Sequence, residues 1–339
     1  MNNQASITGA TVIGATTWGT TLGILLAQNK IPVALLTRTE AEAQTLDSQR
    51  CNSRFLPDTP FPDRLSVTCE PESALRQAGL VVIAVPSDRL RENVQRIKAH
   101  IRPGSIVLSA TKGLELPAAK RMSQVLEDEL PSESHAAICV LSGPNLAKEI
   151  AQGKPASTVI AGRDPDATQK AQNALMSGHF RVYTSSDVLG TELAGALKNI
   201  VALGAGMGDG MEAGENAKAA FITRGVAEMT RLGIAAGADP MTFAGLAGLG
   251  DVVATCSSRL SRNRYVGEQL AKGRSWPEIR ESMENVAEGV NATQAALILA
   301  KDLGVEMPIA EMASRVLFEG LSPQKAMAEL MGRPARSEW

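Results

Sequence analysis

The first half of the chain alternates short apolar runs with longer amphipathic stretches. The apolar runs are Ile7–Ile13, Pro32–Thr37, Leu80–Val85, Ile106–Ser109 and Ala136–Leu141. Runs that are apolar throughout are typical of strands buried on both faces of a parallel sheet. The stretches Asp88–His100 and Ala118–Glu129 have helical spacing, and Ser157–Ala161 and Arg181–Thr184 extend or flank the sheet. This alternation predicts a doubly wound α/β domain over residues 1–187.

The pattern changes near Asp187, beyond which no further strand-like run occurs. Gly and Ala instead recur at three- and four-residue spacing, as in VLGTELAGALKNIVALGAGM and AAFITRGVAEMTRLGIAAG. Small residues at this spacing let helix backbones approach closely. We therefore predict an all-helical domain over residues 188–339, with no strand of four or more residues. Such helices also suit a homodimer, which is the assembly we expect.

Composition narrows the class of function. The 339 residues are 44% hydrophobic, and 34 basic against 36 acidic residues leave a net charge of −2. This balance gives no broad electrostatic surface for nucleic acid or an anionic membrane. The four cysteines and three histidines lack metal-ligand spacing, so we expect neither a metal site nor a disulfide framework. Residues 1–29 carry no charge but are interrupted by Thr and Gly, unlike a signal peptide, and we expect a cytoplasmic protein.

A glycine turn between the first strand and the first helix predicts a dinucleotide site. The strand Ile7–Ile13 leads into Gly14-Ala15-Thr16-Thr17-Trp18-Gly19 and then into an apolar helix. In a Rossmann-like domain Gly14 makes the turn, Gly19 lets the helix pack on the strand, and the helix N-terminus faces the pyrophosphate. Thr16 stands where the middle glycine of G-x-G-x-x-G is usual, which weakens the motif; a plain strand-turn-helix is the alternative.

Arg38 follows the second strand, where an NAD-specific site would place an acidic residue. Its guanidinium suits the 2′-phosphate of NADP. A solvated loop arginine is the alternative, and Glu40 keeps the use of NAD possible. We expect NADP(H), NAD(H) or both as cofactor.

Two lysines and one helix start carry the candidate chemistry. Lys112 lies in a Lys-Gly turn just past a sheet strand, at the end where α/β folds bind ligands. Lys198 lies on a helix with small neighbours and is either a surface residue or a functional one. Asp251 ends a glycine-rich loop and could orient such a lysine. Ser261 fits an N-cap.

The helix that begins after Ser261 carries Arg262 and Asn263 in its first turn. Backbone N–H groups, the helix dipole and a guanidinium converge there, which suits a phosphate group. A solvated helix start is the alternative for Arg262 and Arg264.

Four motifs identify a family. They are SATKGLE (Ser109–Glu115), SGPNLAKE (Ser142–Glu149), ELAGALKN (Glu192–Asn199) and GLAGLGD…SRNR (Gly245–Arg264). With the glycine turn, they closely resemble bacterial-type NAD(P)-dependent glycerol-3-phosphate dehydrogenases over nearly the whole chain. The resemblance implies a Rossmann domain followed by a helical domain similar to that of 6-phosphogluconate dehydrogenase. It implies reduction of dihydroxyacetone phosphate to sn-glycerol 3-phosphate for phospholipid synthesis.

The resemblance also implies site residues. Its substrate contacts fall on Lys112, Gly143, Asn145, Lys198, Asp251, Ser261, Arg262 and Asn263. Its cofactor contacts fall on Thr17, Trp18, Arg38, Lys112, Ala147, Arg262, Val286 and Glu288, in addition to Gly14 and Gly19. Asn145 replaces the usual Ser or Thr, and Leu146 the usual Phe; an Asn can still hydrogen-bond to the substrate.

The implied reaction transfers hydride from nicotinamide C4 to the carbonyl carbon, with Lys198 as the proton donor. A lysine is in its acid form at neutral pH, so reduction needs little tuning whereas oxidation needs a neutral lysine. The nearest rival is another dehydrogenase of the same architecture, acting on 6-phosphogluconate or a 3-hydroxyacid; the phosphate-ready helix start disfavours plain hydroxyacids. A nucleotide sensor without turnover is the rival from another class, and it has no need of Lys112 and Lys198.

Overall fold

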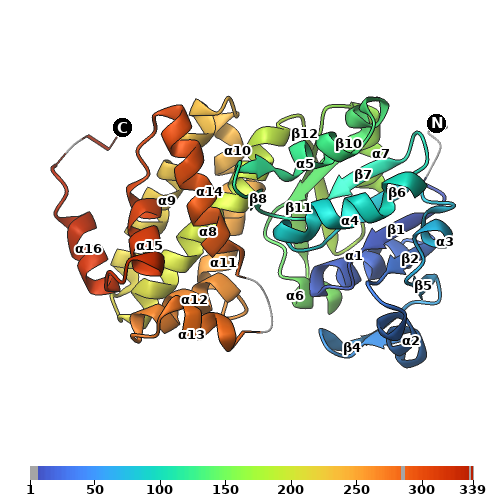
Figure 1. The fold of residues 1–339 in the computed structure, drawn as a ribbon, viewed down its shortest axis with the longest axis horizontal. Coiled ribbons are helices and arrows are strands. Elements are labelled where there is room, and N and C mark those ends of the chain that lie inside the picture. Colours follow the sequence, from blue (N-terminus) through green and yellow to red (C-terminus); the bar gives the residue numbers. More distant parts are fainter. Residues whose placement is uncertain (1–6, 284–286, 336, 339) are drawn as a thin grey trace. The chain divides into compact units, whose positions relative to one another are not determined.

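The computed structural model describes residues 7–283, 287–335, 337 and 338, which divide into two compact units. Unit 1 runs to Glu115 and resumes over Lys120–Glu192, whereas unit 2 takes Leu116–Ala119 and the chain from Leu193 onward. The division falls inside the long helix α8 (Val188–Gly210), a little beyond the boundary expected near Asp187. Figure 1 shows the chain coloured along its sequence.

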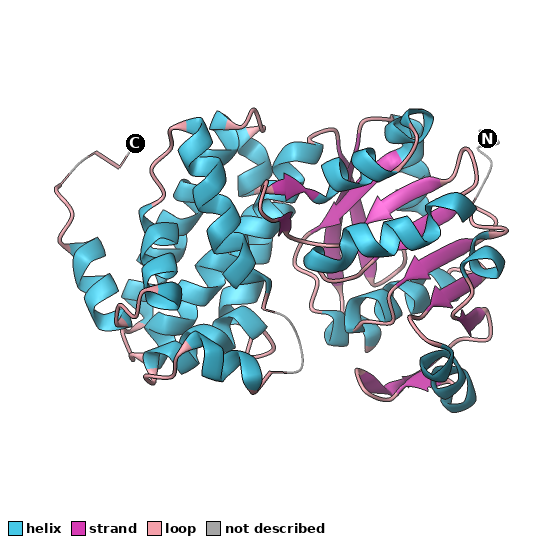
Figure 2. Cartoon of the chain, viewed as in Figure 1, coloured by secondary structure: helices cyan, strands magenta, loops and turns pink. Residues whose placement is uncertain are grey.

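Unit 1 is built on one eight-stranded sheet with the order β12-β11-β10-β7-β6-β1-β2-β5. Neighbouring strands run parallel except β10 and β11, which are antiparallel. The strands are β1 (Ala10–Ile13), β2 (Val33–Leu36), β5 (Leu65–Thr68), β6 (Leu80–Ile83), β7 (Ile106–Ser109), β10 (Ile138–Ser142), β11 (Ala156–Gly162) and β12 (Phe180–Ser185), drawn magenta in Figure 2. The expected doubly wound, mostly parallel sheet is confirmed.

Helices cover both faces of this sheet. Alternate residues of its strands point to opposite sides, and apolar side chains on both sides pack against helices. In β6, Leu80 and Val82 join the hydrophobic cluster that contains α1 and α7, whereas Val81 and Ile83 join the cluster that contains α3, α4 and α5. The helices are α1 (Thr17–Gln28), α2 (Glu40–Gln49), α3 (Pro71–Leu75), α4 (Leu90–Ile97), α5 (Met122–Glu129), α6 (Ala147–Ala151) and α7 (Pro165–Leu175). Burial on both faces explains why the strands are apolar throughout.

Several boundaries differ from those expected. The helix expected from Ala118 begins at Met122, because Ala119 has a φ of +50° and Lys120–Arg121 form the strand β9. The strand β9 pairs with β8 (Leu114–Glu115), and a second hairpin pairs β3 (Cys51–Asn52) with β4 (Leu56–Pro60). Three of these four strands have only two residues, and β4 has a proline at two of its five positions, so no alternation predicted either hairpin.

Unit 2 contains helices and connecting loops, and the described residues after β12 form no strand. Its helices, besides most of α8, are α9 (Glu215–Ala235), α10 (Pro240–Ala244), α11 (Asp251–Ser257), α12 (Arg262–Ala271), α13 (Trp276–Glu281), α14 (Glu288–Leu303), α15 (Pro308–Phe318) and α16 (Pro323–Met331). Helix α8 is long and apolar enough to cross a membrane, but 83% of its most apolar 18-residue stretch is buried inside the protein. That burial is typical of a core helix, and the expected all-helical second half is confirmed.

A buried carboxylate joins two helices of unit 2. Glu228 of α9 accepts hydrogen bonds from the backbone N–H groups of Ile309 and Ala310, at 2.9 and 3.0 Å, in the first turn of α15. These donors would otherwise lack partners inside the helix. Burial nevertheless dominates and raises the pKa of Glu228 to about 7.

Candidate active site

The turn between β1 and α1 lies where the order of strands reverses, the usual ligand position in a doubly wound sheet. Gly14 has a φ of +104°, and a Cβ on Gly19 would lie 2.0 Å from the carbonyl oxygen of Gly14. Thr16 is the N-cap of α1: its Oγ1 accepts from the Gly19 N–H at 3.0 Å and donates to the Ala84 carbonyl at 2.9 Å. The threonine in place of the middle glycine therefore orders the turn and the helix start.

Two buried polar atoms of unit 1 are candidates for contact with a ligand. Trp18 stacks edge-on against Phe180, with ring centroids 6.5 Å apart, and its Nε1 is buried. Asn145 donates from Nδ2 to Thr158 Oγ1 at 3.0 Å, while its Oδ1 is also buried. Neither Trp18 Nε1 nor Asn145 Oδ1 has a hydrogen-bond partner among the residues that the structure describes. A buried polar atom without a partner is costly, so both atoms suit contact with a bound cofactor or substrate.

Arg38 is exposed just beyond the carboxyl end of β2, the neighbour of β1. Its guanidinium has no hydrogen-bond or ion-pair partner within the described part of the chain, although its backbone N–H donates to Glu42 at 3.2 Å. Glu40, the alternative ribose contact, instead accepts hydrogen bonds from Cys69 and Gln44. The site thus presents a cation, as a 2′-phosphate requires.

Glu40, Cys69 and Glu70 also bring potential metal-ligand atoms within 4.8 Å of one another. The hydrogen bond to Glu40 raises the pKa of the Cys69 thiol to about 11, so the thiol stays protonated at neutral pH. Acidic groups are common at a protein surface without an ion, so these three residues do not by themselves indicate a metal site.

Lys112 lies in the loop that follows β7, and its side chain reaches the loop that follows β10. The Lys112 Nζ donates to the Gly143 carbonyl at 2.8 Å. Thr158 Oγ1 donates to the neighbouring Ser142 carbonyl at 2.9 Å and accepts from Asn145. The structure thus brings together Lys112, Gly143 and Asn145, which the family resemblance assigns to one site.

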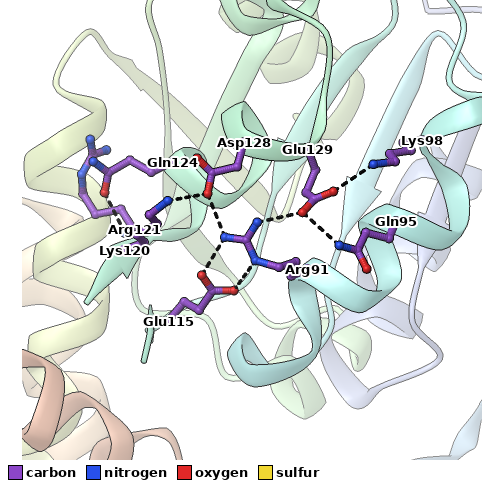
Figure 3. A network of polar contacts seen from close by, with 9 residues as sticks. All are labelled: Arg91, Gln95, Lys98, Glu115, Lys120, Arg121, Gln124, Asp128 and Glu129. Carbon is purple, nitrogen blue, oxygen red and sulfur yellow. Dashed lines mark hydrogen bonds and ion pairs between the residues drawn. The ribbon is translucent and has the colours of Figure 1, made fainter. Parts of the chain in front are cut away.

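A charged network anchors the hairpin that begins just after Lys112 (Figure 3). Arg91 of α4 donates from Nε and from one terminal nitrogen to the two carboxylate oxygens of Glu115, both at 2.8 Å. It also contacts Asp128 at 2.8 Å and Glu129 at 2.7 Å on α5. Hydrogen bonds from Arg91 and Lys98 hold the pKa of Glu129 below its ordinary value. This paired geometry fixes direction as well as distance, and no pattern in the sequence predicted it.

The other strand of that hairpin contacts the start of α8. Arg121 of β9 pairs with the Glu192 carboxylate at 2.6 Å, and Ser123 donates to it from its backbone N–H at 2.7 Å and its hydroxyl at 2.6 Å. Glu192 is buried, and this burial raises its pKa against the opposing effect of Arg121. The first residue of the ELAGALKN motif therefore holds the helix start in place.

Lys198 lies on α8 in a buried polar cluster of unit 2. Its Nζ donates to Thr255 Oγ1 at 2.7 Å and lies 3.1 Å from Asp251 Oδ1. Thr255 in turn donates to Asp251 Oδ1 at 3.1 Å. The side chains of Lys198 and Asp251 are only 10% and 3% exposed. An ammonium with a carboxylate and a hydroxyl can deliver a proton while the carboxylate keeps it oriented.

Ser261 is the N-cap of α12, as expected, because its Oγ accepts from the Arg264 N–H at 3.2 Å. Arg262 is exposed at the first helical position. The side chain of Asn263 is buried and engaged at both ends: Nδ2 donates to Asn199 Oδ1 at 2.8 Å, and Oδ1 accepts from the Gly289 N–H at 2.9 Å. Asn263 therefore offers a ligand its backbone N–H rather than its amide.

The remaining expected residues begin helices or lie outside the described residues. Thr17 and Ala147 are the first residues of α1 and α6, and the Thr21 hydroxyl contacts both their carbonyls, at 2.9 and 3.2 Å. Glu288 is the first residue of α14. Val286 lies outside the described residues.

Sequence reasoning missed Thr255, although a signal existed. Thr255 lies four residues after Asp251, so both face the same side of a helix that begins at Asp251. The network around Arg91 had no such signal, because its members come from separate elements.

Comparison with known proteins identifies the family. A family described as NAD-dependent glycerol-3-phosphate dehydrogenase matches with its N-terminal part over residues 9–168 and with its C-terminal part over residues 187–328. Glycerol-3-phosphate dehydrogenase [NAD(P)+] of Dehalococcoides mccartyi is 49% identical over 328 residues, covering 96% of this chain and 91% of that protein. The Anaeromyxobacter dehalogenans protein of the same name is 46% identical over 329 residues, covering 97% and 99%.

A solved structure agrees. The crystal structure of glycerol-3-phosphate dehydrogenase from Coxiella burnetii matches with a TM-score of 0.90 at 34% identity, covering 96% of this chain and 99% of that one.

Proposed function

Because the chain belongs to the NAD-dependent glycerol-3-phosphate dehydrogenase family, we propose that it reduces dihydroxyacetone phosphate to sn-glycerol 3-phosphate, with Lys198 as the proton donor. The observation that carries the assignment of Lys198 is its buried contact with Asp251 and Thr255, at 3.1 and 2.7 Å. A buried charge is costly unless it is paired, and perturbed or buried charges concentrate at functional sites.

Reduction of a ketone needs one hydride and one proton. The bound reduced nicotinamide supplies the hydride, with its dinucleotide held by the turn from Gly14 to Gly19 and by Arg38. The Lys198 ammonium donates a proton to the oxygen that becomes the alcohol and is then a neutral amine, which regains a proton from water. Asp251 stabilises the ammonium form before transfer and again after this reprotonation.

The start of α12 supplies the phosphate site. Ser261 caps the Arg264 N–H, whereas the N–H groups of Arg262 and Asn263 donate to no other group that the structure describes. Two backbone donors, the helix dipole and the Arg262 guanidinium suit a phosphate dianion. On unit 1, Lys112 and the Asn145 amide provide the polar groups that we assign to substrate contact.

The two rival functions are less well supported. A sensor without turnover has no use for a buried, paired Lys198. A dehydrogenase of plain hydroxyacids has no use for the donors at the start of α12.

Comparing dihydroxyacetone phosphate with dihydroxyacetone tests this function. We expect NADPH oxidation to depend on dihydroxyacetone phosphate and kcat/KM to fall by at least about three decades without the phosphate, because a charge-assisted phosphate site makes several strong contacts. Arg262→Gln should lower kcat/KM for dihydroxyacetone phosphate much more than kcat/KM for dihydroxyacetone. Equal rates with both substrates would contradict the phosphate assignment, and no rate with either would contradict the function.

We further propose that the enzyme is a cytoplasmic homodimer whose product supplies phospholipid synthesis. The small-residue helices of unit 2 support the dimer, and the four free cysteines suit the reducing cytoplasm. Light scattering that gives the mass of a single chain would contradict the dimer.

A further inference from the structure

Helices α8 and α12 touch backbone to backbone within unit 2. A Cβ on Gly206 of α8 would lie 2.0 Å from the carbonyl oxygen of Arg264, and a Cβ on Gly267 of α12 would lie 2.0 Å from that of Leu203. Real Cβ atoms do not come so close, so no other residue fits at either position without a shift of one helix. These glycines therefore set the spacing between the helix that carries Lys198 and the helix that carries the phosphate donors.

Two polar bridges flank this contact. Near Lys198, Asn199 accepts from Asn263 at 2.8 Å. Farther along α8, Asp209 Oδ2 accepts from Arg264 Nε at 2.6 Å and from Lys218 Nζ at 2.9 Å. These three charged side chains are 14–18% exposed. A bridge on either side of a glycine contact restricts both the sliding and the rotation of α12 against α8.

The carboxylate of Asp209 is held in its ionised form. Burial opposes its ionisation, but hydrogen bonds from Lys218 and Arg264 outweigh burial and keep the pKa of Asp209 below its ordinary value. Arg264 also pairs with Glu268, one turn along α12, at 2.8 Å. Arg264 lies in the first turn of α12, and its backbone N–H is the one that Ser261 caps. Holding Arg264 therefore holds the phosphate-binding turn itself.

We propose that Asp209 is a positioning residue for the reaction: through Arg264 it fixes the phosphate-binding start of α12 relative to Lys198. The inference rests on the proposed function. A substrate held at its phosphate must present its carbonyl oxygen to Lys198, and a displacement of about 1 Å in such an alignment costs roughly 100-fold in rate. Asp209 is far along the helix from Lys198, eleven residues or roughly 16 Å at 1.5 Å per residue, so it acts through alignment.

The test compares Asp209→Asn with wild type in three measurements on the full chain. We expect kcat/KM for dihydroxyacetone phosphate to fall at least about tenfold. Competitive inhibition by inorganic phosphate should stay within about twofold, because the α12 donors and the Ser261 cap remain. The NADPH dissociation constant should change much less than kcat/KM, because most of the residues assigned to the cofactor lie in unit 1.

Two further variants separate a loss of alignment from a general loss of structure. Asp166→Asn removes a more exposed carboxylate that has one ion pair of similar length, 2.6 Å to Lys170 on α7, and should change none of the three quantities. If Asp209→Asn does not fold, Arg264→Lys keeps the charge but not the Nε contact and should show the same pattern at smaller size.

Two results would overturn the inference: an unchanged kcat/KM, or a loss of phosphate inhibition as large as the loss of kcat/KM. A wild-type protein that does not turn over dihydroxyacetone phosphate would instead contradict the proposed function.

Discussion

Replacing Lys198 with Met tests the proton donor and the buried ion pair together. Methionine keeps an unbranched side chain but removes the ammonium 3.1 Å from Asp251. Because the side chains are only 10% and 3% exposed, the remaining carboxylate would be a buried charge without this cation. Removing one partner of a buried pair typically costs about 3–5 kcal/mol of stability. Losing a general acid typically costs about 10²–10⁴ in kcat.

A second variant separates these two effects. In Lys198→Met combined with Asp251→Asn, the buried charge is gone, so we expect most of the lost stability to return while kcat stays low. Urea denaturation measures the free energy of unfolding, and NADPH oxidation measures kcat. A primary isotope effect with NADPH deuterated at the transferred position shows whether the chemical step limits the rate.

Two outcomes would refute this reasoning. If Lys198→Met keeps more than about a tenth of wild-type kcat while chemistry is rate-limiting, Lys198 is not the proton donor. Lys112, the other candidate lysine, would then take that role. If the double variant is no more stable than the single one, the cost does not come from an unpaired Asp251 charge.

Three further predictions concern the cofactor, the Lys112 loop and pH. Arg38→Ala should raise the KM for NADPH by about one to two decades, from a lost contact of about 1.5–3 kcal/mol, and the KM for NADH much less; equal effects would show that Arg38 does not contact the 2′-phosphate. Arg91→Lys should raise the KM for dihydroxyacetone phosphate by roughly three- to tenfold, because a lysine cannot pair with both oxygens of Glu115. The control Arg163→Lys changes a single exposed contact with Glu127 and should leave this KM unchanged, so equal KM values for the two variants would contradict the prediction. Because the pKa of Glu228 is raised to about 7, the folded state binds one more proton than the unfolded state between about pH 4.5 and 7. The free energy of unfolding should therefore fall by about 2–3 kcal/mol between pH 5 and 8, and Glu228→Gln should remove this contribution. The same pH dependence of the free energy of unfolding in both proteins, measured with urea, would contradict the prediction.

The sequence predicted those parts of the fold and site that depend on local pattern. The β1–α1 turn follows from Gly14 and Gly19, and the Ser261 cap from a serine before a helical stretch. In the sequence Thr16 weakens the dinucleotide motif, and the structure shows that its hydroxyl caps α1, because a threonine before a helix can accept from a backbone N–H of the first turn.

What the sequence did not predict depends on contacts between distant elements. Arg91 meets Glu115 and Glu129 only because α4, the hairpin and α5 come together in space. The same holds for Asn263, whose side chain is occupied by Asn199 and Gly289. Residue type and spacing placed Asn263 at the start of a helix, but only the structure shows that its amide joins helices.

The most direct test of the account follows both cofactor and product in one reaction. Purified protein is mixed with limiting NADPH and excess dihydroxyacetone phosphate, and the product is identified by chiral analysis. We predict one sn-glycerol 3-phosphate formed for each NADPH oxidised, with Lys198→Met slower by at least about two decades. NADPH oxidation no faster than in a substrate-free blank, or a product of the opposite configuration, would contradict the account.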